Sequence, residues 1–181
     1  MDSYSPGIKV AWQLAAQEAS HLRCWKIETD HLLIAITKIA EIGDSIDQIA
    51  NEQKLPNLIE ISSEAKQVAE AFKKIRVPTS QLRNQLRGAL TCNMAPDYIK
   101  PEIIHRSEKC KATFNNAKSI PKKELEVQLI HLLISILKNC SKLSRNVFVY
   151  HGIDIKVSTS IIESVYVINN ALKHTNKPSL N

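Results

Sequence analysis

The sequence has little glycine, few aromatic residues and no cluster of prolines. Its 181 residues include 4 glycines and 7 prolines, and aromatic residues make up 5% of the chain. Glycine loses the most backbone entropy when a helix forms, so a chain poor in glycine and rich in Ala, Leu, Ile, Lys and Gln favours helices. This composition predicts an all-α fold.

Motifs that support catalysis or bind metals are also missing. The four glycines lie too far apart to build a GxxxxGK[ST] phosphate loop, and neither HExxH nor a CxxC pair occurs. His31 with Cys24, or His131 with Cys140, would form a thiol–imidazole pair without a third group to orient it. We therefore predict no catalytic, cofactor-binding or metal-binding residue, and we do not expect an enzyme.

Long apolar runs and a secretion signal are absent as well. No stretch approaches the roughly 18 to 20 apolar residues that span a bilayer, and residues 1–6 lack the basic start of a signal peptide. Cys24, Cys92, Cys110 and Cys140 are widely separated. Separated cysteines without a signal are typical of free thiols in a cytosolic protein. We expect a cytoplasmic protein with no membrane partner.

Positive charge is concentrated in the second half of the chain. Residues 1–90 carry 11 basic and 11 acidic side chains, whereas residues 91–181 carry 13 and 7, which accounts for the whole net charge of +6. A basic surplus can attract nucleic acids or acidic peptides. Because no aromatic residue interleaves these basic residues, a solvated helical surface is the preferred interpretation. A basic helical nucleic-acid-binding protein remains an alternative.

An internal repeat dominates the sequence that is present. The segment HLLIAI at 31–36 recurs as HLLISI at 131–136, offset by 100 residues. A helix of small residues precedes each copy, one starting at Ser5-Pro6 and the other spanning 107–119. The apolar stripes of these two helices are Ile8, Ala11, Trp12, Ala15, Ala16 and Ala19 in the first, and Cys110, Phe114 and Ala117 in the second.

Each HLL segment is predicted to lie on a buried helix, capped by Thr29 in the first repeat and opened by Pro121 in the second. A short third helix and an amphipathic fourth helix should follow, at 45–53 and 57–75, then at 142–150 and 156–172. Gly152 fits a left-handed residue between the last two. His31 and His131 are predicted to be structural, each bonding a backbone group in the first turn of its helix.

These elements predict one compact domain of two pseudo-symmetric four-helix repeats. Repeat one covers residues 1–75 and repeat two covers 105–173. Between them, 76–104 is predicted to be a linker with a possible short helix from Thr79 or Ser80 to Arg87, followed by a loop at 94–101 that contains two prolines. Residues 174–181 form a polar tail that is expected to fray.

The order and duplication of these elements resemble the N-terminal domain of the Clp/Hsp100 unfoldases, the double Clp-N repeat. The likeness rests on residues 14–19 and 29–33 in the first repeat, and on 131–133 and 151–154 in the second. In that family the domain precedes AAA+ ATPase modules and docks substrates and adaptors. The resemblance implies a non-catalytic domain whose partners are unfolded or tagged protein substrates, adaptor proteins and an AAA+ ATPase ring in cis or in trans. A stand-alone adaptor or regulator without an ATPase is the alternative.

The sequence departs from the family pattern where the HLL helices begin. Family members commonly have Thr-Glu-His there, whereas this chain has Thr29-Asp30-His31 and Leu129-Ile130-His131. In one branch these acidic residues help to bind phosphorylated arginine. The resemblance implies that Asp30 could keep a remnant of that role, whereas Ile130 has no charge to do so.

The predicted docking surface lies at the start of the HLL helices. It comprises Trp25, Glu28, Thr29 and Asp30 in repeat one, with Lys118, Lys122 and Lys123 at the equivalent edge of repeat two. Apolar grooves between helices, with charges on the rim, suit extended segments of other proteins. Changing Asp30 to Lys is expected to alter client binding without lowering stability.

Overall fold

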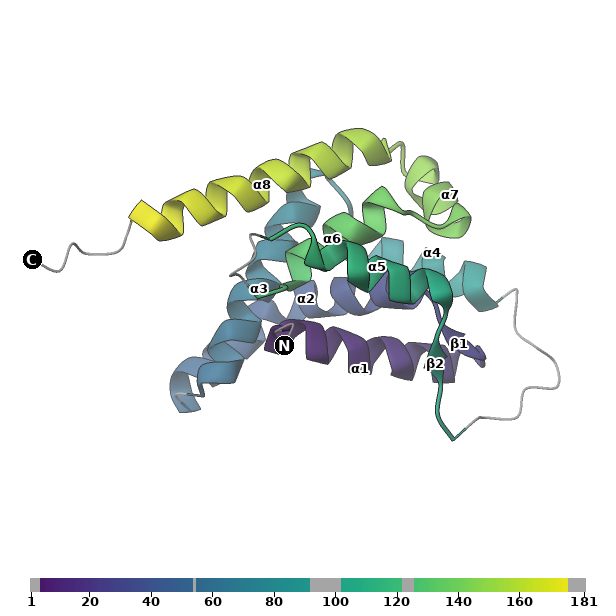
Figure 1. Ribbon diagram of the computed structural model, residues 1–181, viewed down its shortest axis with the longest axis horizontal. Helices are drawn as coiled ribbons and strands as arrows, with labels where there is room; N and C mark the ends of the chain where they lie inside the picture. Colours follow the sequence, from purple (N-terminus) through teal and green to yellow (C-terminus); the bar gives the residue numbers. More distant parts are fainter. Residues whose placement is uncertain (1–3, 54, 92–101, 122–125, 176–181) are drawn as a thin grey trace, which may run out of the picture.

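The computed structural model describes residues 4–53, 55–91, 102–121 and 126–175, which are mostly helical (Figure 1). The elements in these residues are α1 (Pro6–His21), β1 (Lys26–Ile27), α2 (Thr29–Gln53), α3 (Pro56–Lys74), α4 (Thr79–Thr91), β2 (His105–Arg106), α5 (Glu108–Lys118), α6 (Leu129–Lys138), α7 (Lys142–Tyr150) and α8 (Ile155–Thr175). The predicted all-α class is confirmed.

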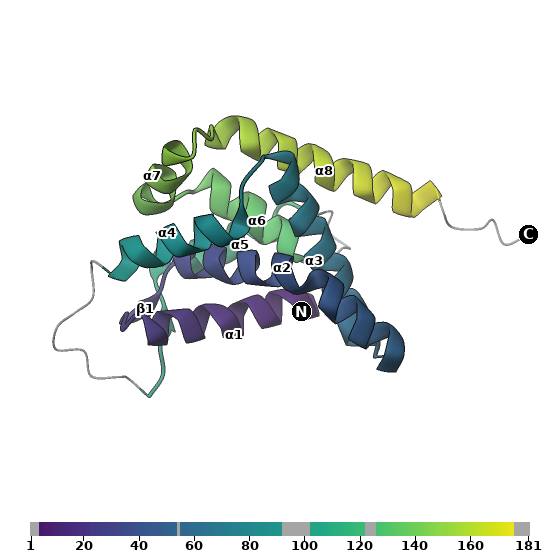
Figure 2. The ribbon, with the colours of Figure 1, turned by 180° about the vertical axis from the view of Figure 1, so that it is seen from behind.

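The two helices that carry the HLL segments form the centre of the molecule. α6 buries every residue from Leu129 to Leu137, and α2 buries residues 29–37. A helix that is apolar all round belongs inside a protein, enclosed by other helices. α1, α3 and α4 pack on α2, α5 and α8 pack on α6, and α2 and α6 contact each other. The repeats therefore share one core, with α7 and α8 together at one side in Figure 2.

Short extended segments join the two repeats reciprocally. β1 and β2 pair in parallel, and the Ser107 N–H donates to the Ile27 carbonyl at 3.0 Å. At the opposite junction Tyr4 bridges to Val127, and the Ser5 N–H donates to the Val127 carbonyl at 3.0 Å. The first helix of each repeat is thus tied to the backbone just before the HLL helix of the other.

Most predicted helices are confirmed, but the short third helix of repeat one does not exist as a separate element. α2 continues through the predicted break to Gln53. Gly43 lies within it, and a Cβ there would come 3.1 Å from the Ala65 Cβ of α3. The Ser62 hydroxyl also donates to the Gly43 carbonyl at 3.2 Å. Gly43 therefore permits close packing of α2 on α3 and does not end a helix.

The predicted start of the second HLL helix at Pro121 is also wrong. α6 begins at Leu129, and its N-cap Gln128 has extended backbone angles of φ −108° and ψ 169°. Val127 is extended too, because it forms the bridge to Tyr4. Pairing with the other repeat keeps this stretch out of the helix.

Two predictions about the segments that connect the helices agree with the structure. Gly152 has a φ of +70° between α7 and α8, as predicted for a left-handed residue. The possible helix after Thr79 forms α4, whose Leu82, Leu86 and Leu90 are buried. The predicted proline-containing loop at 94–101, and residues 176–181 of the tail, lie outside the described residues.

Candidate docking surface

The predicted docking surface is divided, because Lys118 lies apart from the predicted residues of repeat one. Trp25 is 51% exposed and directly precedes β1, whereas Lys118 is the last residue of α5. β1 pairs with β2, which leads into the start of α5, so Trp25 and Lys118 lie near opposite ends of that 11-residue helix. At 1.5 Å per residue this separates them by about 16 Å. Lys122 and Lys123 lie outside the described residues.

Thr29 and Asp30 are only 1% and 6% exposed, so both side chains lie inside the domain and present little surface to a partner. The Oδ1 of Asp30 accepts hydrogen bonds from the hydroxyls of Ser141, at 2.5 Å, and Ser144. Ser141 is the N-cap of α7, and the partial positive charge of a helix N-terminus stabilises a carboxylate there. Asp30 therefore anchors repeat two to repeat one, and a lysine in its place would lower stability, contrary to the prediction.

Glu28 precedes α2 and takes the capping position that was predicted for Thr29. The Glu28 carbonyl accepts from the N–H groups of His31 and Leu32 at 3.2 and 3.4 Å. Its carboxylate accepts a hydrogen bond from the Ser107 hydroxyl at 2.7 Å. Glu28 thus ties the start of α2 to the start of α5, which is a role at the junction between the repeats.

The two HLL histidines have the predicted structural role. The N–H of Glu28 donates to Nδ1 of His31, and the N–H of Gln128 donates to Nδ1 of His131, both at 2.9 Å. Burial lowers the pKa of each imidazole to about 4, so both are neutral at physiological pH. Since Nδ1 accepts in both residues, the proton resides on Nε2.

The described cysteines are buried or half-buried free thiols, namely Cys24, Cys110 and Cys140. Burial raises the pKa of Cys110 to about 12 and of Cys140 to about 11, and it raises the pKa of Cys24 as well. The thiolate is the reactive form of cysteine. These three side chains therefore stay protonated at neutral pH and serve packing.

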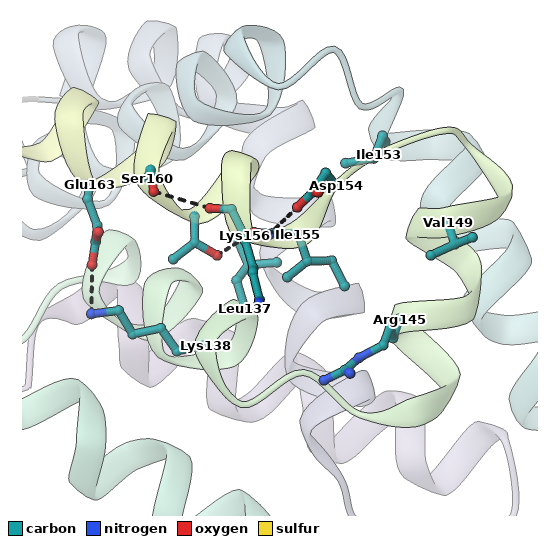
Figure 3. Close-up of a pocket in the computed structure, with 11 residues that line it drawn as sticks. Leu137, Lys138, Arg145, Val149, Ile153, Asp154, Ile155, Lys156, Ser160 and Glu163 are labelled. Carbon is teal, nitrogen blue, oxygen red and sulfur yellow. Dashed lines mark hydrogen bonds and ion pairs between the residues drawn. The ribbon is translucent and has the colours of Figure 1, made fainter.

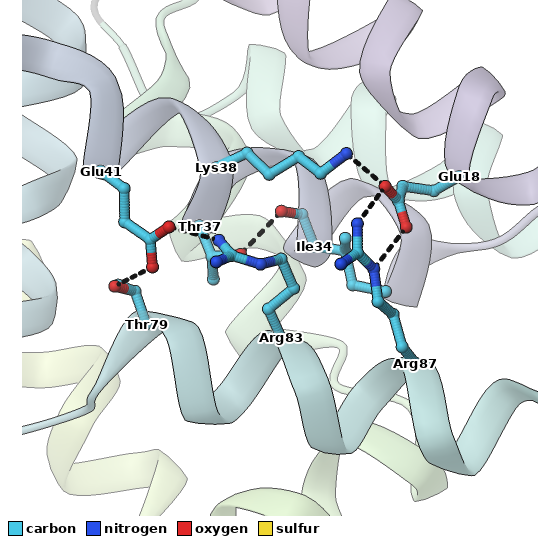
Figure 4. Close-up of polar contacts among 8 residues, drawn as sticks. All are labelled: Glu18, Ile34, Thr37, Lys38, Glu41, Thr79, Arg83 and Arg87. Carbon is cyan, nitrogen blue, oxygen red and sulfur yellow. Dashed lines mark hydrogen bonds and ion pairs between the residues drawn. The ribbon is translucent and has the colours of Figure 1, made fainter. Parts of the chain in front are cut away.

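A half-buried ion pair between α1 and α4 was not predicted (Figure 4). Nε and Nη2 of Arg87 donate to the Glu18 carboxylate at 2.8 and 2.6 Å, and Lys38 of α2 contacts the same group. Burial alone would raise the pKa of Glu18, but the two cations outweigh it and lower this pKa to about 2. Glu18 lies on the same face of α1 as the buried Ala11 and Ala15. This spacing in the sequence could have predicted that Glu18 is buried.

A second buried acid, Glu64 of α3, joins the N-termini of α1 and α6. Its carboxylate accepts from the Ser5 hydroxyl at 2.8 Å and from the N–H groups of Gly7 and Leu129 at 3.1 and 2.7 Å. A Cβ at Gly7 would lie 2.6 Å from Oε1, so only glycine admits the carboxylate here. Burial raises the pKa of Glu64, which the three hydrogen bonds oppose.

The second repeat contains a groove of about 650 Å³ between α6, α7 and α8 (Figure 3). Its apolar lining consists of Leu137, Val149, Ile153 and Ile155, and Val149 is 66% exposed. Ligand sites typically enclose about 300 to 1,000 Å³. Sequence reasoning missed this groove because its residues come from three helices that only the packing brings together.

Charged and polar side chains form the rim of this groove, namely Lys138, Arg145, Asp154, Lys156, Ser160 and Glu163. Lys138 is neutralised by Glu163, with Nζ 2.6 Å from Oε1. The Asp154 carboxylate accepts from the N–H groups of Lys156 and Val157 at 2.7 and 3.1 Å at the start of α8. Within the described ranges, Arg145 and Lys156 form no ion pair with a carboxylate. Arg145 and Lys156 therefore lack a direct carboxylate partner, and with the charged Asp154 the rim has a net charge of +1.

A separate group of exposed basic residues surrounds the paired strands. Lys26 is in register with His105, and Trp25 precedes Lys26. The guanidinium of Arg106 lies 5.0 Å from the centre of the Trp12 ring, a cation–π contact. The fold therefore places aromatic rings beside basic residues that are far apart in the sequence.

Metal-binding clusters and membrane-spanning helices are absent from the part of the chain that the structure describes. It contains no group of three or more His, Cys, Asp or Glu side chains arranged to hold a metal ion. No helix in these residues is long and apolar enough to cross a membrane.

The paired repeats, joined reciprocally around two HLL helices, define the fold of the Clp/Hsp100 N-terminal domain. The chain is similar to the crystal structure of the Hsp104 N-terminal domain from Candida albicans, with a TM-score of 0.61 and 13% sequence identity. The alignment covers 88% of this chain and 89% of that one. No family model and no curated protein matches the sequence. The resemblance predicted from the repeated HLL helices is thus confirmed at the level of the fold.

Proposed function

We propose that this chain is a non-catalytic protein-binding domain that docks substrates or adaptor proteins for an ATP-dependent unfoldase of the Clp/Hsp100 type. The observation that carries the proposal is the fold it shares with the Hsp104 N-terminal domain over 88% of its length. A fold alone does not determine a function, so the proposal also needs a site. The groove between α6, α7 and α8 supplies an apolar lining with a charged rim, which suits a segment of an unfolded or tagged protein.

Binding to fluorescently labelled casein, a protein without a stable fold, tests the client-docking part of the proposal. Fluorescence anisotropy should show saturable binding, and Val149→Asp should weaken it about tenfold, or about 1.4 kcal/mol. Val167, 62% exposed on α8 and not part of the groove lining, provides the matched control, and Val167→Asp should bind like the wild type. Absence of saturable binding would count against client docking, and equal losses in both variants would exclude the groove as its site.

A hybrid protein tests the connection to an unfoldase. This chain would replace the N-terminal domain of an Hsp104-type unfoldase, and ATP-dependent unfolding of a fluorescent client would be followed. The hybrid should unfold the client faster than the same unfoldase without any N-terminal domain. Equal rates would mean that the domain does not deliver clients to that motor.

An immunoblot of the native protein distinguishes an attached domain from a stand-alone adaptor. The chain has a mass of 20.4 kDa. A much heavier band would indicate an attached ATPase, whereas a band near 20.4 kDa would favour the adaptor that acts on a partner's ring.

Nucleic-acid binding is a second candidate function, favoured by the basic and aromatic residues around β1 and β2. Exposed cations such as Lys26 and Arg106 contact phosphates well, and the half-exposed Trp25 lies next to Lys26. A gel shift with single-stranded RNA at low salt tests it. Binding that Arg106→Glu abolishes and that weakens steeply with salt would support this function, and no shift would reject it.

A further inference from the structure

The polar groups on the rim of the α6–α7–α8 groove differ in whether they are already bonded. Thr159 donates its hydroxyl to the Ile155 carbonyl at 2.6 Å, and Ser160 donates to the Lys156 carbonyl at 3.2 Å. Lys138 is paired with Glu163, and Asp154 is bonded to backbone N–H groups. The two hydroxyls and the Lys138–Glu163 pair are satisfied within the domain and offer little to a ligand, whereas Asp154 keeps its negative charge at the start of α8.

Arg145 on α7 and Lys156 on α8 are the exception. Both are exposed, and in the described residues neither forms an ion pair with a carboxylate. Figure 3 shows their side chains directed toward the groove from α7 and α8, with Ile155 between them. A ligand that fills the groove therefore meets two positive charges above an apolar floor.

From this arrangement we infer that the groove binds an extended segment of a partner protein in which acidic residues alternate with apolar ones. The apolar side chains would cover Leu137, Val149 and Ile153, and the carboxylates would pair with Arg145 and Lys156. Successive side chains of an extended segment point to opposite sides. With alternation, the apolar side chains can face the floor of the groove while the acidic ones stay at its open side, where Arg145 and Lys156 form the rim. This inference rests on the proposed docking function and names the chemistry of its partner.

The composition of the groove disfavours other occupants. None of the described residues that line it has an aromatic ring, so bases of a nucleic acid would have no ring there to stack on. A basic segment would be repelled by Arg145 and Lys156. A neutral apolar segment would leave both cations partly desolvated without a partner, which costs free energy. Charge complementarity therefore selects an acidic segment and also speeds its association.

Three fluorescent peptides of about twelve residues, with the same apolar residues, test the inference by anisotropy. The residues between the apolar positions are Asp in the first peptide, Asn in the second and Lys in the third. The wild type should bind the Asp peptide at least about tenfold more tightly than the Asn peptide and should not bind the Lys peptide. Affinity for the Asp peptide should fall as salt is added.

Charge reversal shows where the peptide binds. The double variant Arg145→Glu, Lys156→Glu should bind the Asp peptide with about tenfold or more lower affinity, and it should gain affinity for the Lys peptide. Lys9→Glu, an exposed reversal on α1, should behave like the wild type. Circular dichroism confirms that each variant is folded. Equal affinity for the three peptides, or an unchanged preference in the double variant, would overturn the inference.

The remaining outcomes separate this inference from the proposed function. If casein binds at the groove but the three peptides are not distinguished, docking stands and the acidic preference fails. If the Asp peptide binds but the hybrid unfoldase gains nothing, the preference stands and the link to the motor fails. A dimer in light scattering that Val149→Asp dissociates, or RNA binding that the double reversal removes, would assign the groove to another occupant and overturn the inference.

Discussion

Three carboxylates in this domain hold the ends of helices through serine side chains. The pairs are Ser5 with Glu64, Ser107 with Glu28, and Ser141 with Asp30. In each case the serine oxygen caps its own helix by accepting a backbone N–H, while its hydroxyl hydrogen goes to the carboxylate. A hydroxyl has one donor and two acceptor sites, so both bonds can form at once. Ser107–Glu28 and Ser141–Asp30 each connect repeat two to repeat one. Ser5–Glu64 connects the start of α1 to α3 within repeat one.

Removing the Asp30 carboxylate should destabilise the protein. Asp30→Ala leaves the hydroxyls of Ser141 and Ser144 without their acceptor in a buried position, and we expect the free energy of unfolding to fall by about 3 kcal/mol. Asp30→Asn keeps an acceptor oxygen and should lose less. Urea denaturation measures both. The control is Glu70→Ala, which removes an exposed pair with Lys74 and should cost no more than about 0.5 kcal/mol.

That comparison also tests the earlier docking hypothesis for Asp30. If Asp30→Ala is as stable as Glu70→Ala but binds clients less well, Asp30 acts in recognition and the structural role assigned to it is wrong.

His131 should make stability depend on pH in the mildly acidic range. Its pKa is about 4 in the folded protein and about 6.5 in an unfolded chain, so the unfolded state binds more protons between these values. Stability is therefore complete above about pH 6.5 and falls as the pH drops toward 4, by about 3 kcal/mol for this one group. Urea denaturation at a series of pH values measures the loss.

A variant isolates this contribution. His131→Asn retains an acceptor for the Gln128 N–H but does not titrate, so its stability should fall less than that of the wild type over the same range. His21→Asn, on the exposed end of α1, is the control and should keep the wild-type profile. Parallel profiles for the wild type and His131→Asn would refute the assignment.

At the scale of the elements, the sequence predicted helix ends correctly where the residues at the end themselves determine the backbone conformation. Ser5-Pro6 starts α1, Ser107 caps α5, and Gly152 separates α7 from α8. The separate helix at 45–53 and the helix start at Pro121 were predicted wrongly, because α2 packs on Ala65 of α3 past residue 43 and Val127 pairs with Tyr4 of the other repeat. A local pattern contains no information about such partners.

Gly43 of α2 and Gly88 of α4 should respond differently to alanine. At Gly88, which is exposed in α4, a Cβ meets nothing within 4 Å, so Gly88→Ala should stabilise by about 0.5 to 1 kcal/mol through helix propensity. At Gly43 the Cβ would crowd Ala65 and cancel that gain, and Gly43→Leu should destabilise by about 2 kcal/mol. Thermal denaturation ranks the variants.

A second substitution at Ala65, which faces Gly43, tests whether crowding causes the loss of stability in Gly43→Leu. Ala65→Gly should partly restore Gly43→Leu, because it removes the methyl group that the new side chain meets. If Gly43→Leu is as stable as Gly88→Ala, the close approach of α2 and α3 is not what maintains glycine at position 43.

At the scale of the whole molecule, the sequence predicted the duplication and hence the class of fold, because HLL segments at a fixed offset identify two equivalent buried helices. It did not predict the docking groove. Asp30 was selected as a surface acid from its position in a motif, whereas its environment is set by α7, more than 100 residues later. Arg145 and Lys156 were not selected, because a cation becomes available to a ligand only when the packing leaves it without a carboxylate.

The shared core predicts that both repeats unfold together. α2 and α6 contact each other, and Glu64 of repeat one bonds the first N–H of α6. Trp12 and Trp25 belong to repeat one, and Trp12 also contacts Arg106 and Phe114 of repeat two, so their fluorescence reports on repeat one and its junction with repeat two. Far-ultraviolet circular dichroism reports on all helices. The urea transitions of the two signals should coincide. Leu133→Ala, which empties a buried site in repeat two, should cost about 2 to 5 kcal/mol and shift the tryptophan transition as far as the dichroism transition. If Leu133→Ala leaves the midpoint of the tryptophan transition unchanged, the repeats are independent units. The groove of repeat two could then be studied without repeat one.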